Sequence, residues 1–175
     1  HRSDDEAGRR CRRADFDAAA EGQDLRGALG VAPGLDETTL LERVFIGGEE
    51  ALIRRILPVL AGGGSTDQKA RARLAVLLPL APSLAALSVL EDILLTGSGA
   101  KEPFTAKLGA FPTKALRQAL GPVQDDLERL MLRTEAARPD RIALALLRKT
   151  EALHRFARAF LSRYRAAKDR RGWLD

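Results

Sequence analysis

The residue types that most often perform catalysis are scarce in this sequence. His1 and His154 are the two histidines, and Cys11 is the single cysteine. A zinc site needs three or four nitrogen, sulfur or oxygen ligands, and nucleophilic catalysis needs a Ser or Cys beside a base such as His. We therefore predict that this chain has no catalytic residue, no metal site and no cofactor-binding residue, and that it is not itself an enzyme. We interpret His154 as an ordinary residue at the border of an apolar helix face.

A glycine-rich segment at residues 61–69 (AGGGSTDQK) invites a phosphate-loop interpretation. A P-loop places a lysine directly before its Ser or Thr, and here Gly64 precedes Ser65. We interpret the segment as a hinge between helices.

Three pairs of adjacent carboxylates could in principle act as acids and bases. Neighbouring residues diverge by about 100° around a helix, so neither member of such a pair can share a proton or a metal with the other unaided. We interpret the pairs as solvated helix starts: Glu49-Glu50, Glu91-Asp92 and Asp125-Asp126.

Positive charge is concentrated near the C-terminal end. Residues 141–175 hold ten Lys/Arg and three Asp/Glu, whereas residues 14–100 hold seven and twelve. This asymmetry favours an anionic partner, and Lys and Arg are the side chains that bind DNA phosphates. The alternative is a face that only keeps the protein in solution. The candidate DNA-binding residues are Arg148, Arg155, Arg158 and Arg165 on the last helix, and Lys101, Lys107, Lys114 and Arg117 in and after a long loop.

The elements that position these residues are predicted to be helices. Leu and Ala supply most of the apolar residues and aromatic residues make up only 5% of the chain, a composition that favours helix over strand. Asp36 or Thr38 can cap the first helix, and Pro58 should kink or shorten the second. Ser65 and Gln68 form a capping-box pattern for a helix that begins near Thr66. Pro79 and Pro82 interrupt the next stretch, a turn-rich loop fills residues 97–112, and helical patterns resume at 113.

A long basic amphipathic helix is predicted from about residue 140 to residue 171. Its apolar stripe is interrupted by Lys149, and the arginines lie on the other side. The aromatic members of the stripe are interpreted as core residues. The stripe consists of Ile142, Leu146, Leu153, Phe156, Phe160 and Tyr164.

The chain is predicted to be all-α, an irregular multi-helix domain. Residues 1–13 are a charged arm, disordered or tag-derived at its start; residues 14–171 form a single helical domain; residues 172–175 begin a connection to a further domain. No apolar run approaches the about 20 residues that cross a bilayer, so we expect no membrane contact and a cytoplasmic location. The abrupt end at Trp173-Leu174-Asp175 suggests an excised piece of a longer protein.

Three segments resemble the AddA-type subunits of UvrD/Rep-like superfamily 1 DNA helicases. Residues 95–120 are similar to a "FLT…GEPRK…TKAL" pattern in which the basic PRK is replaced by PFTAK here, and residues 145–175 resemble a long helix that ends "…Y…K…LDFDDL". Residues 62–74 (GGGSTDQKARARL) are similar to a "GGKTDQKRA" region. The motor signatures of the family are missing from the sequence.

The resemblance implies an accessory domain 1B of a bacterial ATP-dependent helicase that takes part in double-strand break repair and recombination. The parent would be a hydrolase that uses ATP and Mg, and its partners would be DNA, as duplex or single strand, and an AddB-type nuclease/helicase subunit. The fragment would contribute sequence-independent contacts to the DNA backbone. The alternative is a helical protein-interaction module that docks on a partner subunit or on the motor core.

Overall fold

The structure is a computed structural model that describes residues 25–172. The chain divides into two compact units. Residues 35–142 form one unit, and the described residues 25–34 and 143–172 belong to the other. The predicted arm at 1–13 and the terminal Trp173-Leu174-Asp175 lie outside the described residues.

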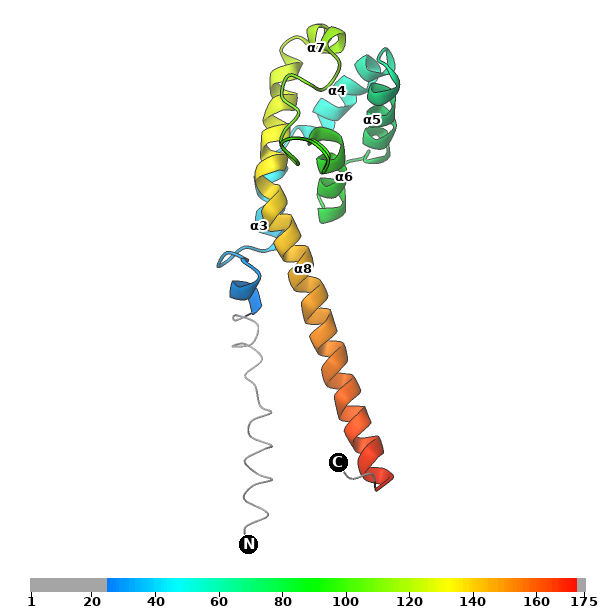
Figure 1. Cartoon of the computed structure of the whole chain (residues 1–175). Coiled ribbons are helices and arrows are strands. Elements are labelled where there is room, and N and C mark those ends of the chain that lie inside the picture. The colour runs from blue at the N-terminus through cyan, green and yellow to red at the C-terminus, as the bar shows by residue number, and fades with distance from the viewer. Residues whose placement is uncertain (1–24, 173–175) are drawn as a thin grey trace. The chain divides into compact units, whose positions relative to one another are not determined.

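Helices make up nearly all of the regular structure, so the all-α prediction is confirmed (Figure 1). Within residues 25–172, the β structure is limited to one isolated antiparallel bridge between Leu95 and Ala106. Residues 25–28 form a short helical turn, and the helices from residue 37 onward are α3 to α8.

Helix α3 (Glu37–Val44) begins at the cap that the sequence predicts. The backbone N–H of Thr39 donates to Asp36 Oδ1 at 2.8 Å, and the backbone N–H of Asp36 donates to Thr39 Oγ1 at 3.0 Å. Two backbone donors that the first turn leaves unpaired are thereby satisfied. Asp36 is therefore the N-cap, and the alternative cap at Thr38 is wrong.

Helix α4 (Glu49–Ala61) continues through Pro58 to its end. It packs against α5 and α7 and buries Leu52, Ile53, Ile56 and Leu60, which recur at helical spacing. Pro58 stands in the last turn, where the loss of one backbone donor does not stop the helix.

Helix α5 (Ser65–Val76) starts one residue earlier than the capping-box pattern predicts. Gly64 is the N-cap, and it has no side chain to accept a hydrogen bond from the first turn. The Gln68 side chain instead donates to the carbonyl of Gly63 at 3.1 Å. The predicted Ser65–Gln68 capping box is therefore wrong, although the helix itself is present.

Helix α6 (Leu84–Leu94) follows the segment interrupted by Pro79 and Pro82. The Ser83 hydroxyl caps it by accepting from the backbone N–H of Ala86 at 3.1 Å. The loop that follows folds back on itself, because Thr96 Oγ1 donates to the carbonyl of Glu102 at 2.7 Å and accepts from the backbone N–H of Thr105 at 3.0 Å. Helix α7 (Lys114–Leu120) closes this part of the chain.

Helix α8 (Val123–Arg170) is a single helix of 48 residues. The sequence predicts a last helix that begins at about residue 140, and that start is wrong because the helix begins at Val123 and runs through Pro139. Arg138 and Arg141 flank the proline and both bind Glu91 of α6, while Asp140 pairs with Arg43 of α3. These contacts hold both sides of Pro139 in place. Gly172 follows the helix with a left-handed φ of 62°, a conformation common at helix ends.

The core of the 35–142 unit consists mainly of Leu and Ile. The N-terminal part of α8 contributes to it beside α3, α4, α5 and α6 (Figure 1). Its largest fully buried side chains are those of Leu35, Leu40, Ile53, Ile56, Leu60, Leu74, Leu87, Leu90, Leu94, Leu127, Leu130 and Met131.

Candidate nucleic-acid interface

The C-terminal part of α8, from residue 151 to its end, is exposed on nearly all sides. Only Ala157, Ala167 and Lys168 there are partly covered, and none of its residues is buried. Residues 151–172 hold seven Lys/Arg and two Asp/Glu, so this exposed segment has a strong net positive charge. An exposed helix of this charge is able to bind an anionic polymer.

The basic residues predicted on this helix lie on one side of it. At about 100° per residue, Arg148, Arg155, Arg158 and Arg165 fall within an arc of about 100°. All four residues are exposed. From the first to the last they span about 26 Å along the helix axis at 1.5 Å per residue. The structure therefore brings these four predicted DNA-binding residues onto one accessible face.

The opposite side of the same stretch carries an apolar stripe that is open to solvent. Phe156 is 66% exposed, Phe160 54% and Tyr164 51%. The three rings stack in succession with centroids 6.1 Å apart, as expected for side chains four residues apart on a helix. The interpretation of these aromatics as core residues is wrong, because periodicity identifies an apolar face without showing that anything covers it.

Lys107, a predicted DNA-binding residue of the loop, is used inside the 35–142 unit. Its Nζ donates to the carbonyl of Ile93 at 2.6 Å, and the side chain is half-buried. Burial lowers the pKa of Lys107, and the positive charge of Arg73 lowers it further, against a smaller opposing effect from Asp92. Its main contact is therefore structural, between the loop and the end of α6.

Of the other three loop candidates, one also has a structural contact and two are exposed. Arg117 donates to the carbonyl of Pro112 at 2.9 Å and fixes the start of α7. Lys101 in the loop and Lys114 at the first position of α7 are exposed. The loop set belongs to the 35–142 unit and the arginine set to the other unit, so they are two separate candidate surfaces.

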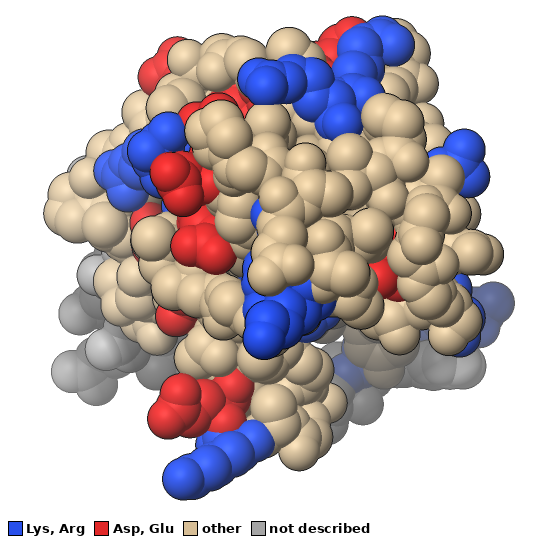
Figure 2. All heavy atoms as spheres, turned by 90° about the horizontal axis from the view of Figure 1, so that it is seen from above, with Lys and Arg blue, Asp and Glu red and all other residues tan. Residues whose placement is uncertain are grey.

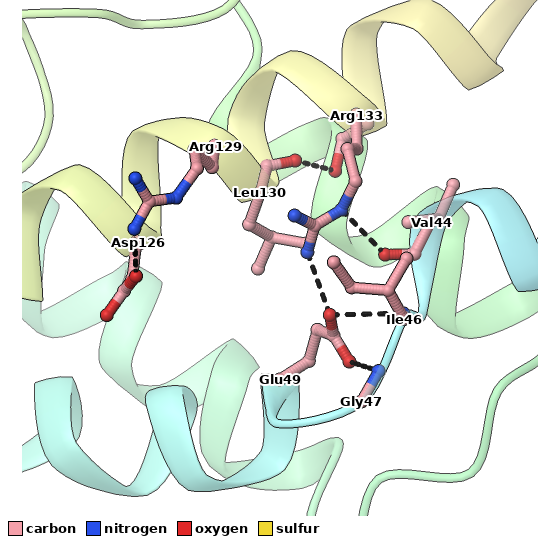
Figure 3. A network of polar contacts seen from close by, with 9 residues as sticks. Val44, Ile46, Gly47, Glu49, Asp126, Arg129, Leu130 and Arg133 are labelled. Atoms are coloured by element: carbon pink, nitrogen blue, oxygen red, sulfur yellow. Dashed lines mark hydrogen bonds and ion pairs between the residues drawn. The ribbon is translucent and has the colours of Figure 1, made fainter.

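A buried carboxylate joins α4 to α8 (Figure 3). Glu49 is only 5% exposed, and its oxygens accept from the backbone N–H groups of Ile46 and Gly47 at 3.2 and 3.0 Å. Arg133 of α8 donates to Glu49 at 2.8 Å and to the carbonyl of Val44 at 3.0 Å. With these donors bound to it, the carboxylate of Glu49 holds the start of α4 against α8.

A second buried carboxylate joins α6 to α8. Glu91 is 2% exposed, and Arg138 and Arg141 bind both of its oxygens. Hydrogen bonding to Glu91 raises the pKa of Arg141. The guanidinium of Arg138 also lies 3.7 Å from the centre of the Phe104 ring, a cation–π contact that draws the loop toward α8.

These two acids correct the interpretation of the carboxylate pairs. Glu49 and Glu91 are buried and paired with arginines, and Glu91 stands in the last turns of α6 rather than at a helix start. Their arginine partners are 84 and 47 to 50 residues away, so no local pattern could reveal the pairs. One available signal was the position of Glu91 between Leu87, Leu90 and Leu94, on the apolar side of its helix.

A polar cavity of about 410 Å³ lies beside these contacts, between α5, α6 and the loop. Cations and acids alternate around it: Arg73 pairs with Asp92 at 2.6 Å, and Glu91 is bound by Arg138. With Lys107, the lining holds three cations and two acids, so it has a smaller excess of positive charge than the exposed part of α8. On the face drawn in Figure 2, Lys and Arg likewise form separate groups between acidic and other residues.

Among residues 25–172, no group of three or more His, Cys, Asp or Glu is placed to hold a metal ion. In the same part of the chain, no helix has both the length and the hydropathy required to span a bilayer. No family model matches the sequence, and comparisons with curated proteins and with solved structures gave no match.

Proposed function

We propose that this chain binds the sugar-phosphate backbone of DNA through the exposed arginines of α8. The observation that carries the proposal is the arc of Arg148, Arg155, Arg158 and Arg165 on one accessible side of the helix. Guanidinium groups bind phosphates with charge-assisted hydrogen bonds, and such contacts do not depend on base sequence.

The wider role that we propose is that of an accessory domain in an AddA/UvrD-like helicase that repairs double-strand breaks in the cytoplasm. Support for this role comes from the sequence resemblance of residues 62–74, 95–120 and 145–175, and from the all-helical fold. In this role ATP and Mg would act in the motor domains of the parent, and an AddB-type subunit would be its partner.

Binding of labelled duplex and single-stranded oligonucleotides, followed by fluorescence anisotropy at several salt concentrations, tests the DNA contact. Replacing Arg155, Arg158 and Arg165 together by Ala should weaken binding by about tenfold or more. The slope of log affinity against log salt should become shallower by about two to three, because each lost phosphate contact removes about 0.7 to 0.9 from it.

A matched variant separates a local contact from an effect of net charge. Arg55, Lys69 and Arg71 are exposed cations of α4 and α5 outside the candidate surfaces, and their replacement by Ala removes the same charge. This control should retain most of the affinity. Equal losses in the two triple variants, or no binding by the native chain at low salt, would refute the proposed contact. A large loss in the double variant K101A/K114A would move the site to the loop.

A second candidate function is protein docking, and the exposed stripe on α8 favours it. Large apolar side chains that are more than half exposed often mark an interaction surface. The docking function uses the face opposite the arginines, so the two functions are separable by mutation.

A further inference from the structure

The exposed stripe on α8 has the spacing of a helix-pairing seam. Leu146, Leu153 and Phe160 recur every seven residues, and Lys149, Phe156 and Arg163 follow each of them by three. This alternation of three and four residues is the pattern by which two α-helices pack along their length. The geometry therefore suits a helical partner.

The surface along this seam is open to solvent. Leu153 is 62% exposed and Phe156 66%. Small residues border the seam at the same seven-residue interval, and three of these four residues are exposed, so a partner backbone has room to approach closely. They are Ala145, Ala152, Ala159 and Ala166.

Two cations interrupt the seam and determine which partner fits. Lys149 and Arg163 are both exposed and stand two heptads apart, about 21 Å along the helix. A partner that covered them with apolar residues would bury unpaired charges at a cost of several kcal/mol. A fitting partner must bring a counter-charge to each position.

Pairing of two α8 seams cannot supply those counter-charges. In a parallel pair Lys149 would face Lys149 and Arg163 would face Arg163. In an antiparallel pair the facing seam residues would be apolar or basic, because the seam from Leu146 to Arg163 contains no acid. Glu151 lies on the far side of the helix, about 140° or more from every residue of the stripe.

We propose that the seam binds an amphipathic α-helix of a partner protein that places carboxylates opposite Lys149 and Arg163. Its apolar residues cover Leu153, Phe156 and Phe160, and its two acids, two heptads apart, fix the register. This inference rests on the second candidate function, protein docking, and gives that function the chemistry of its partner.

Two synthetic helical peptides of about three heptads test the inference on the full chain. Both carry Leu along the seam; at two seam positions two heptads apart, one peptide has Glu and the other Lys. The Glu peptide should bind at least about tenfold more tightly, since the Lys peptide opposes like charges. The variant K149E/R163E should reverse this preference, and F156A/F160A should weaken binding of the Glu peptide by about tenfold or more.

Three outcomes would overturn the inference. Equal binding of the two peptides by the native chain would remove the charge requirement. A native chain that sediments as a stable dimer at micromolar concentration would make a second copy the occupant. Loss of single-stranded DNA binding in F156A/F160A, without peptide binding by the native chain, would assign the aromatics to base stacking.

Different variants test the DNA proposal and the docking proposal. The variant R155A/R158A/R165A should lose DNA affinity and keep its preference for the Glu peptide. The variant K149L/R163L should self-associate in sedimentation experiments, because the cations that oppose pairing of two copies are gone. A monomeric K149L/R163L would contradict the role given to the two cations.

Discussion

Arg141 binds Glu91 through two parallel hydrogen bonds, from Nε to Oε1 and from Nη2 to Oε2, the latter at 2.7 Å. Arg138 binds the same carboxylate from the other side of Pro139. One acid of α6 thus binds one arginine on each side of the proline of α8, close to the point where the sequence predicts the last helix to begin.

Replacing Glu91 by Ala should destabilise the 35–142 unit by about 3–5 kcal/mol. The substitution leaves two largely buried guanidinium groups without their carboxylate, and an uncompensated buried charge is costly. Urea unfolding followed by circular dichroism measures the change in midpoint.

The matched control for Glu91 is its neighbour Asp92. Asp92 pairs with Arg73 at 2.6 Å, but both side chains are about half exposed or more. Replacing Asp92 by Ala should therefore cost less than about 1 kcal/mol. Similar midpoints for the two variants would show that the Glu91 cluster does not stabilise the fold.

Replacing Gly63 by Ala should destabilise the junction of α5 and α7 by about 1–3 kcal/mol. A Cβ at this position would stand 2.5 Å from the Cβ and Oδ2 of Asp67 and 2.7 Å from Cδ1 of Leu116. Asp67 is 1% exposed and accepts from the backbone N–H of Thr113 at 3.3 Å, so it cannot move without weakening that contact.

The adjacent glycine provides the comparison. A Cβ on Gly64 would meet no atom within 4 Å, and this residue has an ordinary negative φ of −71°. Gly64→Ala should change the thermal midpoint far less than Gly63→Ala. A Gly63→Ala variant as stable as the native chain would mean that the Asp67 region rearranges freely.

Lys107 should titrate below the ordinary lysine pKa of about 10.4. Burial disfavours its charged form and Arg73 adds repulsion, so the folded protein binds this proton less tightly than the unfolded chain. Between the folded pKa and the unfolded pKa, the unfolded chain holds more protons, and stability should therefore rise with pH across that window.

Carbon-13 NMR of the reductively methylated protein measures the pKa of Lys107, and K107R identifies its signal. The rise in stability across the same window should disappear in K107R, because arginine stays charged there. A Lys107 signal that titrates at or above the ordinary value would contradict the half-buried position of this side chain.

Part of the local structure could be predicted from the sequence, although the Ser65–Gln68 capping box is wrong. The capping box of α3 depends on Asp36 and Thr39, which are three residues apart, and the cap of α6 depends on Ser83 at its boundary. Signals of this range are contained in a short window of sequence. The basic side of α8 is likewise a matter of helical spacing, and Arg148, Arg155, Arg158 and Arg165 do share one face.

The rest depended on contacts between distant residues. Pro139 disfavours a helix by itself, but contacts with distant residues hold α8 on both sides of it: Arg138 and Arg141 pair with Glu91, and Asp140 pairs with Arg43. The aromatic residues of α8 have the spacing of core residues: Phe156, Phe160 and Tyr164. Whether another element packs on that face cannot be predicted from the spacing alone. The sequence predicts Lys107 as a DNA-binding residue, because its half-buried contact with the carbonyl of Ile93 cannot be recognised from the sequence.

Tyr164 is the one tyrosine of the chain, and it stands at the end of the exposed aromatic stack. The proposed docking seam therefore has an intrinsic spectroscopic reporter stacked on one of its residues, Phe160. Any helix that covers the stack should alter the absorbance of this single tyrosine, without a label. Chemical nitration of tyrosine would likewise modify one known position, so protection from the reagent would directly report occupancy of the seam.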